Sequence, residues 1–167
     1  DMSTGSLGQG ISAAVGMALG AKLKGKEFRV YTALGDGEIE EGQVWEAAMF
    51  AGNHKLDNLV AVVDYNNLQI DGSLDEVNSP CPIDEKFAAF GWNVIVINGH
   101  CFDEIDEAFK KAKEFKGKPT CIVAKTVKGK GVSFMEDKCD WHGSAPNAEQ
   151  YEQAMKELGD ALNALEV

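Results

Sequence analysis

Apolar and polar residues follow two different periods along this chain. Four apolar runs have the length of strands, at 29–34, 58–64, 92–97 and 119–126. The run at 58–64 reads NLVAVVD and is nearly continuous in apolar residues. Such runs are typical of parallel strands that are covered on both faces. We therefore predict buried strands in a parallel sheet.

Stretches with helical periodicity separate these runs, at 10–23, 38–53, 83–90, 103–115 and 148–165. In the stretch 103–115, one side of the helix collects the apolar residues Ile105, Ala108, Phe109 and Ala112. Strands that alternate with helices predict a three-layer α/β fold with a mostly parallel sheet. Ligands of such folds bind at the carboxyl ends of the strands.

Two of the predicted helices have unusual compositions. The helix 10–23 is rich in alanine and glycine, and each glycine costs about 1 kcal/mol relative to alanine. We expect a packing reason for its glycines Gly10, Gly16 and Gly20, namely the close approach of another helix or of a ligand. The helix 38–53 begins with several glutamates, which the helix dipole favours at that end.

The charge balance excludes some classes of partner. Sixteen basic and 27 acidic residues give a net charge of −11, which disfavours nucleic acids and anionic membrane surfaces. An anion site in this chain must therefore depend on backbone amides, a metal ion or a few placed lysines. No apolar run is long enough to span a bilayer and no signal peptide is recognisable, so we expect a cytoplasmic protein.

The cysteines and the start of the chain add two further expectations. Cys81, Cys101, Cys121 and Cys139 form no C-x-x-C pair, so we expect reduced thiols rather than a zinc site or a redox dithiol. The segment TGSLGQG at 4–10 has no strand before it. We interpret residues 1–167 as one domain whose N-terminal part is missing.

Candidate ligands for a metal ion follow the first two predicted strands. Gly35-Asp36-Gly37 ends the first strand, and Asn66 follows the second. A carboxylate from Asp36, an amide oxygen from Asn66 and the backbone carbonyl of Leu68 are ligands that suit Mg²⁺ or Ca²⁺. With one carboxylate, this site would be incomplete without an anionic ligand such as a diphosphate. An ordinary acidic turn is the alternative for Gly-Asp-Gly alone, and the pairing with Asn66 argues against it.

The pairing of Gly-Asp-Gly with Asn66 resembles the motif of a known family. The segment 35–72 resembles the thiamine diphosphate motif, in which Gly-Asp-Gly is followed after roughly 30 residues by asparagine, in its transketolase form. The segments TGSLGQG at 4–10, KTVKGKG at 125–131 and WHG at 141–143 agree with this resemblance. It implies the fold of the domain that binds the diphosphate of the cofactor, and it covers nearly the whole chain.

The resemblance also implies roles for single residues. Asp36, Asn66 and the Leu68 carbonyl correspond to the metal ligands, and Gly37 corresponds to a backbone contact with the diphosphate. We count its neighbour Glu38 among the cofactor contacts.

Three other positions correspond to contacts with the rings of the cofactor. Gly5 and Leu7 match contacts with the aminopyrimidine and thiazolium rings, and Ile70 matches a residue beside the thiazolium. For Leu7 and Ile70, plain core packing stays open as an alternative.

Four charged or titratable positions complete the set of candidates. His142 resembles the family histidine beside the diphosphate and the reacting carbons of the substrate, where imidazole suits proton transfer. Lys128 matches a lysine near the cofactor.

Glu41 and Glu46 match acidic residues at a dimer interface, and a solvated helix face explains them equally well. We expect Lys130 to be exposed and interpret His54 and His100 as loop or helix-start residues.

The implied reaction transfers a two-carbon ketol unit from a ketose phosphate to an aldose phosphate, as in the pentose phosphate pathway. Activating the cofactor requires a glutamate from a pyrimidine-binding domain, for which this chain has no candidate segment. The resemblance therefore implies a partner domain or C-terminal subunit that supplies the pyrimidine-binding site, in a dimer of such pairs. Three alternatives stay open: 1-deoxyxylulose-5-phosphate synthase, which usually lacks an acidic residue at position 41, a dihydroxyacetone synthase, and a non-catalytic cofactor-binding module.

Overall fold

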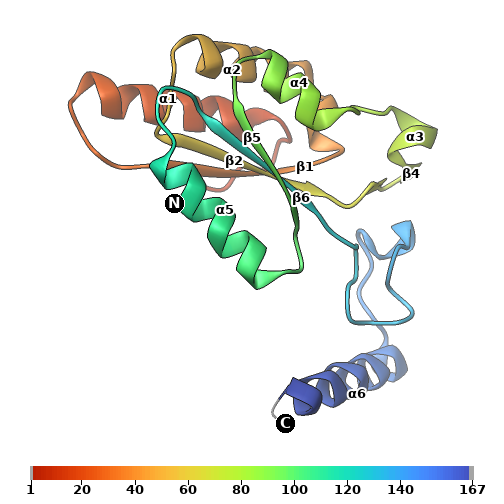
Figure 1. Cartoon of the computed structure of the whole chain (residues 1–167). Coiled ribbons are helices and arrows are strands. Elements are labelled where there is room, and N and C mark those ends of the chain that lie inside the picture. The colour runs from red at the N-terminus through yellow and green to blue at the C-terminus, as the bar shows by residue number, and fades with distance from the viewer. Residues whose placement is uncertain (1, 166–167) are drawn as a thin grey trace.

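A computed structural model describes residues 2–165 (Figure 1). Its strands and short 3₁₀ turns are β1 (Val30–Gly35), η1 (Glu38–Glu40), β2 (Leu59–Tyr65), β3 (Leu68–Gln69), β4 (Gly72–Ser73), β5 (Asn93–Asn98), β6 (Thr120–Lys125) and η2 (Cys139–Trp141). Its helices are α1 (Gln9–Leu23), α2 (Gly42–Asn53), α3 (Leu74–Val77), α4 (Ile83–Ala89), α5 (Phe102–Glu114) and α6 (Ala148–Leu165).

The main sheet is parallel throughout and has the order β1-β2-β6-β5. Gly35 of β1 is in register with Asp64 of β2, and Tyr65 of β2 is in register with Lys125 of β6. The carboxyl ends of these neighbouring strands therefore meet at one edge of the sheet. The segments that follow β1, β2 and β6 begin side by side.

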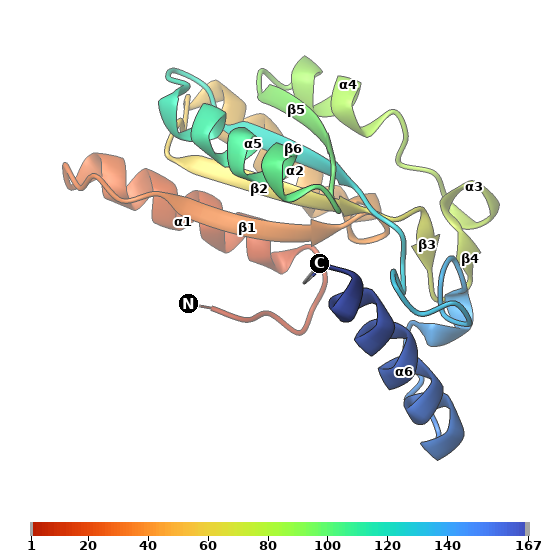
Figure 2. The same cartoon turned by 60° about the horizontal axis from the view of Figure 1, so that its bottom comes forward.

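Helices cover the sheet from both sides, as Figures 1 and 2 show. α1, α2 and α4 pack on one face, in a core that includes Ala61 of β2 and Cys121 of β6. α5 packs on the other face, where Val60 and Ile122, the neighbours of those two residues, point. Alternate residues of the central strands thus serve opposite cores. The three-layer α/β fold predicted from the sequence is confirmed.

The prediction of a helix at 38–53 is wrong for its first turn. Residues 38–40 form the 3₁₀ turn η1, Glu41 has an extended backbone, and α2 begins only at Gly42. The glutamates therefore precede the first turn of α2 instead of occupying it. This break allows the chain to turn sharply after Gly-Asp-Gly.

Two further differences concern the ends of the sheet. The hairpin β3–β4 is absent from the sequence prediction, because strands of two residues leave no periodicity in a sequence. The sequence predicts a fully buried β5, yet this strand lies at the edge of the described sheet, and Val96 is 45% exposed.

The glycines of α1 differ in their surroundings. A Cβ on Gly10 would lie 3.2 Å from the Thr4 hydroxyl, whereas Gly16 and Gly20 have no neighbouring atom within 4 Å of such a Cβ. The packing partner expected for Gly16 and Gly20 is therefore not found within residues 2–165. None of the helices in this range combines the length and the hydrophobicity that a membrane span requires.

Candidate functional site

The site lies where β1, β2 and β6 end. Asp36 directly follows β1, and its backbone N–H donates to the carbonyl of Asp64 in β2 (3.2 Å). Thr126 directly follows β6, and its N–H donates to the carbonyl of Tyr65 (3.0 Å), the residue before Asn66. Hydrogen bonds thus extend the pairing of the strands by one residue beyond the sheet. They place Asp36, Asn66 and Thr126 at neighbouring positions.

The Asp36 carboxylate is almost fully buried, with 2% of the residue exposed. One oxygen accepts a hydrogen bond from the Gly37 N–H (2.9 Å), and the other accepts from the Asn67 N–H. Asn67 has a left-handed backbone (φ 64°), a conformation that asparagine tolerates better than most residues. Burial raises the pKa of Asp36, although the backbone hydrogen bonds lower it in part. Within residues 2–165 no lysine or arginine forms an ion pair with this carboxylate.

A short hairpin packs on the Gly-Asp-Gly turn. The Asn66 side-chain oxygen accepts from the Leu68 N–H (3.1 Å), which fixes the amide at the start of β3. A Cβ on Gly37 would lie 3.1 Å from the Gln69 amide oxygen, so the glycine permits this close approach. The hairpin that contains Leu68 therefore packs against the turn that carries Asp36. An amide oxygen has a second lone pair, so the Asn66 oxygen remains able to coordinate a cation.

These residues fit the metal that the sequence implies. A buried carboxylate without a counter-ion is unfavourable, and a divalent cation would supply the missing positive charge. In the described part of the chain, no group of three or more His, Cys, Asp or Glu side chains is arranged so that it could hold a metal ion. A cation at this site would therefore depend on amide, carbonyl and ligand oxygens in addition to Asp36.

Glu38 holds the N-terminal loop against the end of β1. One of its oxygens accepts from the Gly8 N–H (2.9 Å), and the other accepts from the Gly35 N–H (3.0 Å). Gly8 has a left-handed backbone (φ 83°), and a Cβ there would lie 3.0 Å from Glu41. Glu38 therefore positions the loop that carries Gly5 and Leu7. A direct contact between Glu38 and the cofactor stays a prediction.

The structure decides against plain core packing for Leu7 and Ile70. Leu7 is 62% exposed and Ile70 is 69% exposed, although both are large apolar side chains. Gly5 has no neighbour within 4 Å of an added Cβ. All three positions are open to a ligand or to another polypeptide.

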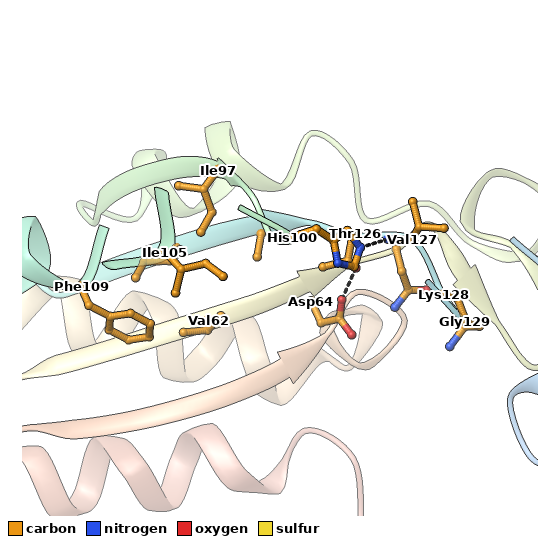
Figure 3. Close-up of a pocket in the computed structure, with 14 residues that line it drawn as sticks. Val62, Asp64, Ile97, His100, Ile105, Phe109, Thr126, Val127, Lys128 and Gly129 are labelled. Atoms are coloured by element: carbon orange, nitrogen blue, oxygen red, sulfur yellow. Dashed lines mark hydrogen bonds between the residues drawn. The ribbon is translucent and has the colours of Figure 1, made fainter. Parts of the chain in front are cut away.

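A pocket of about 450 Å³ runs from the sheet edge to α5 (Figure 3). Its apolar lining includes Val62, Ile105 and Phe109. Asn66 and Lys128 both line the pocket. The structure thus brings the half-buried Lys128 to the same cavity as one of the predicted metal ligands.

His142 lies on the long segment between β6 and α6. It follows η2, where the Trp141 indole N–H donates to the Phe134 carbonyl (3.0 Å) and packs against the Phe134 ring. His142 itself is exposed, and its imidazole makes no hydrogen bond to the described residues. The structure therefore fixes the turn that carries His142 without bringing its side chain into contact with Asp36.

His100 has a contact that the sequence did not predict. Its imidazole Nε2 accepts from the Val127 N–H (2.8 Å), across the ends of β5 and β6. The two residues are 27 positions apart, so no local sequence pattern signals the contact. His54, in contrast, is exposed and stacks on Phe50 (4.0 Å between ring centroids), as expected of a residue outside the site.

The remaining charged candidates lie on the surface. Glu41 and Glu46 are exposed, which agrees with an interface and with a solvated helix face alike. Lys130 is exposed, as expected, and lies 3.5 Å from Glu136. All four cysteines are free thiols.

Comparisons with known proteins agree on one family. Residues 1–166 match the family described as "Transketolase, thiamine diphosphate binding domain". The chain is 51% identical over 158 residues to SqwG, a subunit of the 6-deoxy-6-sulfo-D-fructose transketolase of Clostridium sp. (strain MSTE9). It is 43% identical over 166 residues to one of the subunits of the apulose-4-phosphate transketolase of Phocaeicola vulgatus. These alignments cover 95% and 99% of the chain, but 58% and 59% of the relatives.

A solved structure gives the same result. The transketolase of Campylobacter jejuni superposes with a TM-score of 0.88 at 36% sequence identity. The superposition covers 93% of this chain and 26% of that one. The chain therefore spans somewhat more than half of the two subunit relatives and about a quarter of the larger transketolase.

Proposed function

The chain belongs to the family of transketolase thiamine diphosphate binding domains, and we propose that it is the diphosphate-binding half of a split transketolase. In this proposal residues 1–167 form one domain and require a second subunit that binds the pyrimidine end of the cofactor. Two relatives are named as transketolase subunits, which supports a two-subunit assembly. Dimers of such pairs, working in the cytoplasm, complete the proposal.

The observation that carries the proposal is the buried Asp36 carboxylate, which has no cationic partner among residues 2–165. We assign Mg²⁺, or Ca²⁺, to the oxygens of Asp36, Asn66 and the Leu68 carbonyl. This set carries a single negative charge, so the cation keeps a net positive charge that attracts a diphosphate. The site thereby allows a protein with a net charge of −11 to bind an anionic cofactor.

The other site residues hold different parts of the cofactor. We propose that the Gly37 backbone contacts the diphosphate and that Lys128 adds positive charge beside it. Leu7 and Ile70 are exposed apolar side chains, and we assign them to the aromatic rings of the cofactor together with Gly5. A pyrimidine-binding partner would cover these side chains further, and Glu41 and Glu46 are our candidates for contacts between subunits.

Thiamine diphosphate supplies, when bound, the stabilised carbanion chemistry that this chain lacks. The chain's own contribution is to bind and orient the diphosphate end and to provide one proton-transfer group. We assign that role to His142, because an imidazole can accept and return a proton near neutral pH. Its exposed position on the segment after β6 leaves it accessible to a substrate.

The substrates we propose are a ketose phosphate as donor and an aldose phosphate as acceptor. The names of the relatives add candidate donors to this list. One name contains 6-deoxy-6-sulfo-D-fructose, and another contains apulose-4-phosphate. These sugars share a ketol end and differ at the anionic end. A donor panel should therefore vary the anionic group while keeping the ketol end constant.

A cofactor titration tests the binding part of the proposal. We expect thiamine diphosphate to bind only when Mg²⁺ is present, and EDTA to release it, because the cation links Asp36 to the diphosphate. Isothermal calorimetry on the full-length protein, with and without its partner subunit, measures this. Absence of heat in both samples would overturn the assignment and favour a non-catalytic module.

An activity assay tests the need for a partner. We expect the isolated chain to show no ketol transfer from xylulose 5-phosphate to ribose 5-phosphate, and the pair of subunits to show it. Coupled assays of the chain alone, the partner alone and the mixture provide the comparison. Substantial turnover by the pure chain would contradict the split-enzyme proposal.

A further inference from the structure

The His100 imidazole forms part of the pocket wall next to Lys128, as the close-up shows (Figure 3). Its Nε2 accepts a hydrogen bond from the Val127 N–H (2.8 Å), and Val127 directly precedes Lys128. Imidazole nitrogens can serve as hydrogen-bond donors or acceptors, and Nε2 is the acceptor in this contact. The ring therefore acts here as a hydrogen-bond acceptor for the backbone.

The end of β5 is built to present this ring. Gly99 lies so close to β6 that an added Cβ would be 2.5 Å from the Thr126 methyl group, and its N–H donates to the Lys125 carbonyl (2.8 Å). The next residue is fixed as well, because the His100 N–H donates to the Asn98 side-chain oxygen (3.0 Å). The backbone on both sides of Gly99 is thus held before the imidazole reaches Val127.

Hydrogen bonds fix successive residues of the segment that follows β6. Thr126 donates from its N–H to Tyr65 and from its hydroxyl to Asp64. The Lys128 carbonyl accepts from the Asp137 N–H (3.0 Å). Between these two attachments, the Val127 N–H has no hydrogen-bond acceptor other than His100 among residues 2–165.

We propose that His100 is a positioning residue that fixes Val127 and thereby aims Lys128 at the anion bound beside Asp36 and Asn66. The inference rests on the proposed function for the identity of that anion. It goes beyond it by assigning a role to a side chain that has no part in the binding motif. Without the acceptor, the Val127 N–H turns to solvent. The backbone from which the Lys128 side chain projects is then no longer fixed.

Two substitutions at His100 distinguish the effect of the hydrogen-bond acceptor from the effect of the aromatic ring. His100→Gln keeps an oxygen at roughly the place of Nε2, so it retains the hydrogen bond, whereas His100→Phe keeps a ring without an acceptor. We expect His100→Phe to weaken thiamine diphosphate binding about 5- to 10-fold, in line with the loss of one hydrogen bond. His100→Gln should stay within about 3-fold of the wild type. His54→Gln, at an exposed histidine outside the site, is the matched control and should change nothing.

The test combines calorimetry with hydrogen exchange in the full-length protein bound to its partner subunit. Exchange of the segment 125–132, measured without cofactor, should accelerate in His100→Phe and not in His100→Gln. In a Lys128→Ala background, His100→Phe should cause little further loss of affinity, because the two residues act through one contact. Equal affinities of wild type and His100→Phe, or an undiminished loss in the Lys128→Ala background, would overturn the inference. A wild type that binds no cofactor would instead overturn the proposed function, and the exchange data would still show whether His100 holds the segment.

Discussion

Asp36→Ala is expected to abolish the magnesium-dependent binding of thiamine diphosphate. The substitution removes the one carboxylate that we assign to the cation, and the Asn66 and Leu68 oxygens carry no charge to replace it. Loss of a partner that merely orients a metal ligand already costs about 10- to 100-fold in affinity, so loss of the ligand itself should cost at least about 100-fold. Calorimetric titration with cofactor and Mg²⁺ measures the effect.

The Asp36→Ala protein should remain folded. Asp36 lies outside both apolar clusters that hold the helices on the sheet, and burial already disfavours its charged form. Far-UV circular dichroism and thermal unfolding check this. Asp106→Ala is the matched control, because that carboxylate is exposed on α5 and pairs with Lys110. Unchanged cofactor affinity in Asp36→Ala would refute the metal site and the functions built on it.

Much of the fold could be predicted because its elements are long and periodic. α6 has the predicted bounds 148–165, and α1 differs from the prediction by a single residue at its start. The elements that were missed or misplaced are short, such as the hairpin β3–β4 and the turn η1. They are set by contacts with the Gly-Asp-Gly turn, for example Gln69 against Gly37, which the local sequence does not encode.

The candidate site divides in the same way. The placement of Asp36 and Asn66 at one edge of the sheet could be predicted, because parallel strands bring their carboxyl ends together. Their choice as candidate ligands follows from the few residue types that bind a hard cation. The supporting contacts could not be found. Glu38 accepts from Gly8, 30 positions away, and His100 accepts from Val127, 27 positions away. Only the folded chain brings these segments together.

Gly52→Ala is expected to destabilise the fold strongly. Gly52 lies in α2, where an added Cβ would be 1.9 Å from the Phe90 carbonyl oxygen and 3.7 Å from the Trp92 ring. The oxygen belongs to the backbone after α4 and cannot move away as a side chain could. α2 is also tied to this region by the Trp92 indole N–H, which donates to the Ala48 carbonyl (2.8 Å). We therefore expect a loss of about 3 kcal/mol or more in the free energy of unfolding.

Gly20→Ala, in the C-terminal half of α1, is the matched control with the opposite expected sign. Nothing lies within 4 Å of a Cβ at Gly20, so alanine should stabilise that helix by about 0.5–1 kcal/mol. Urea unfolding of both variants, compared with the wild type, measures the difference. A Gly52→Ala protein as stable as Gly20→Ala would mean that α2 and the end of α4 are not in contact. The described packing of α2 against the end of α4 would then be wrong.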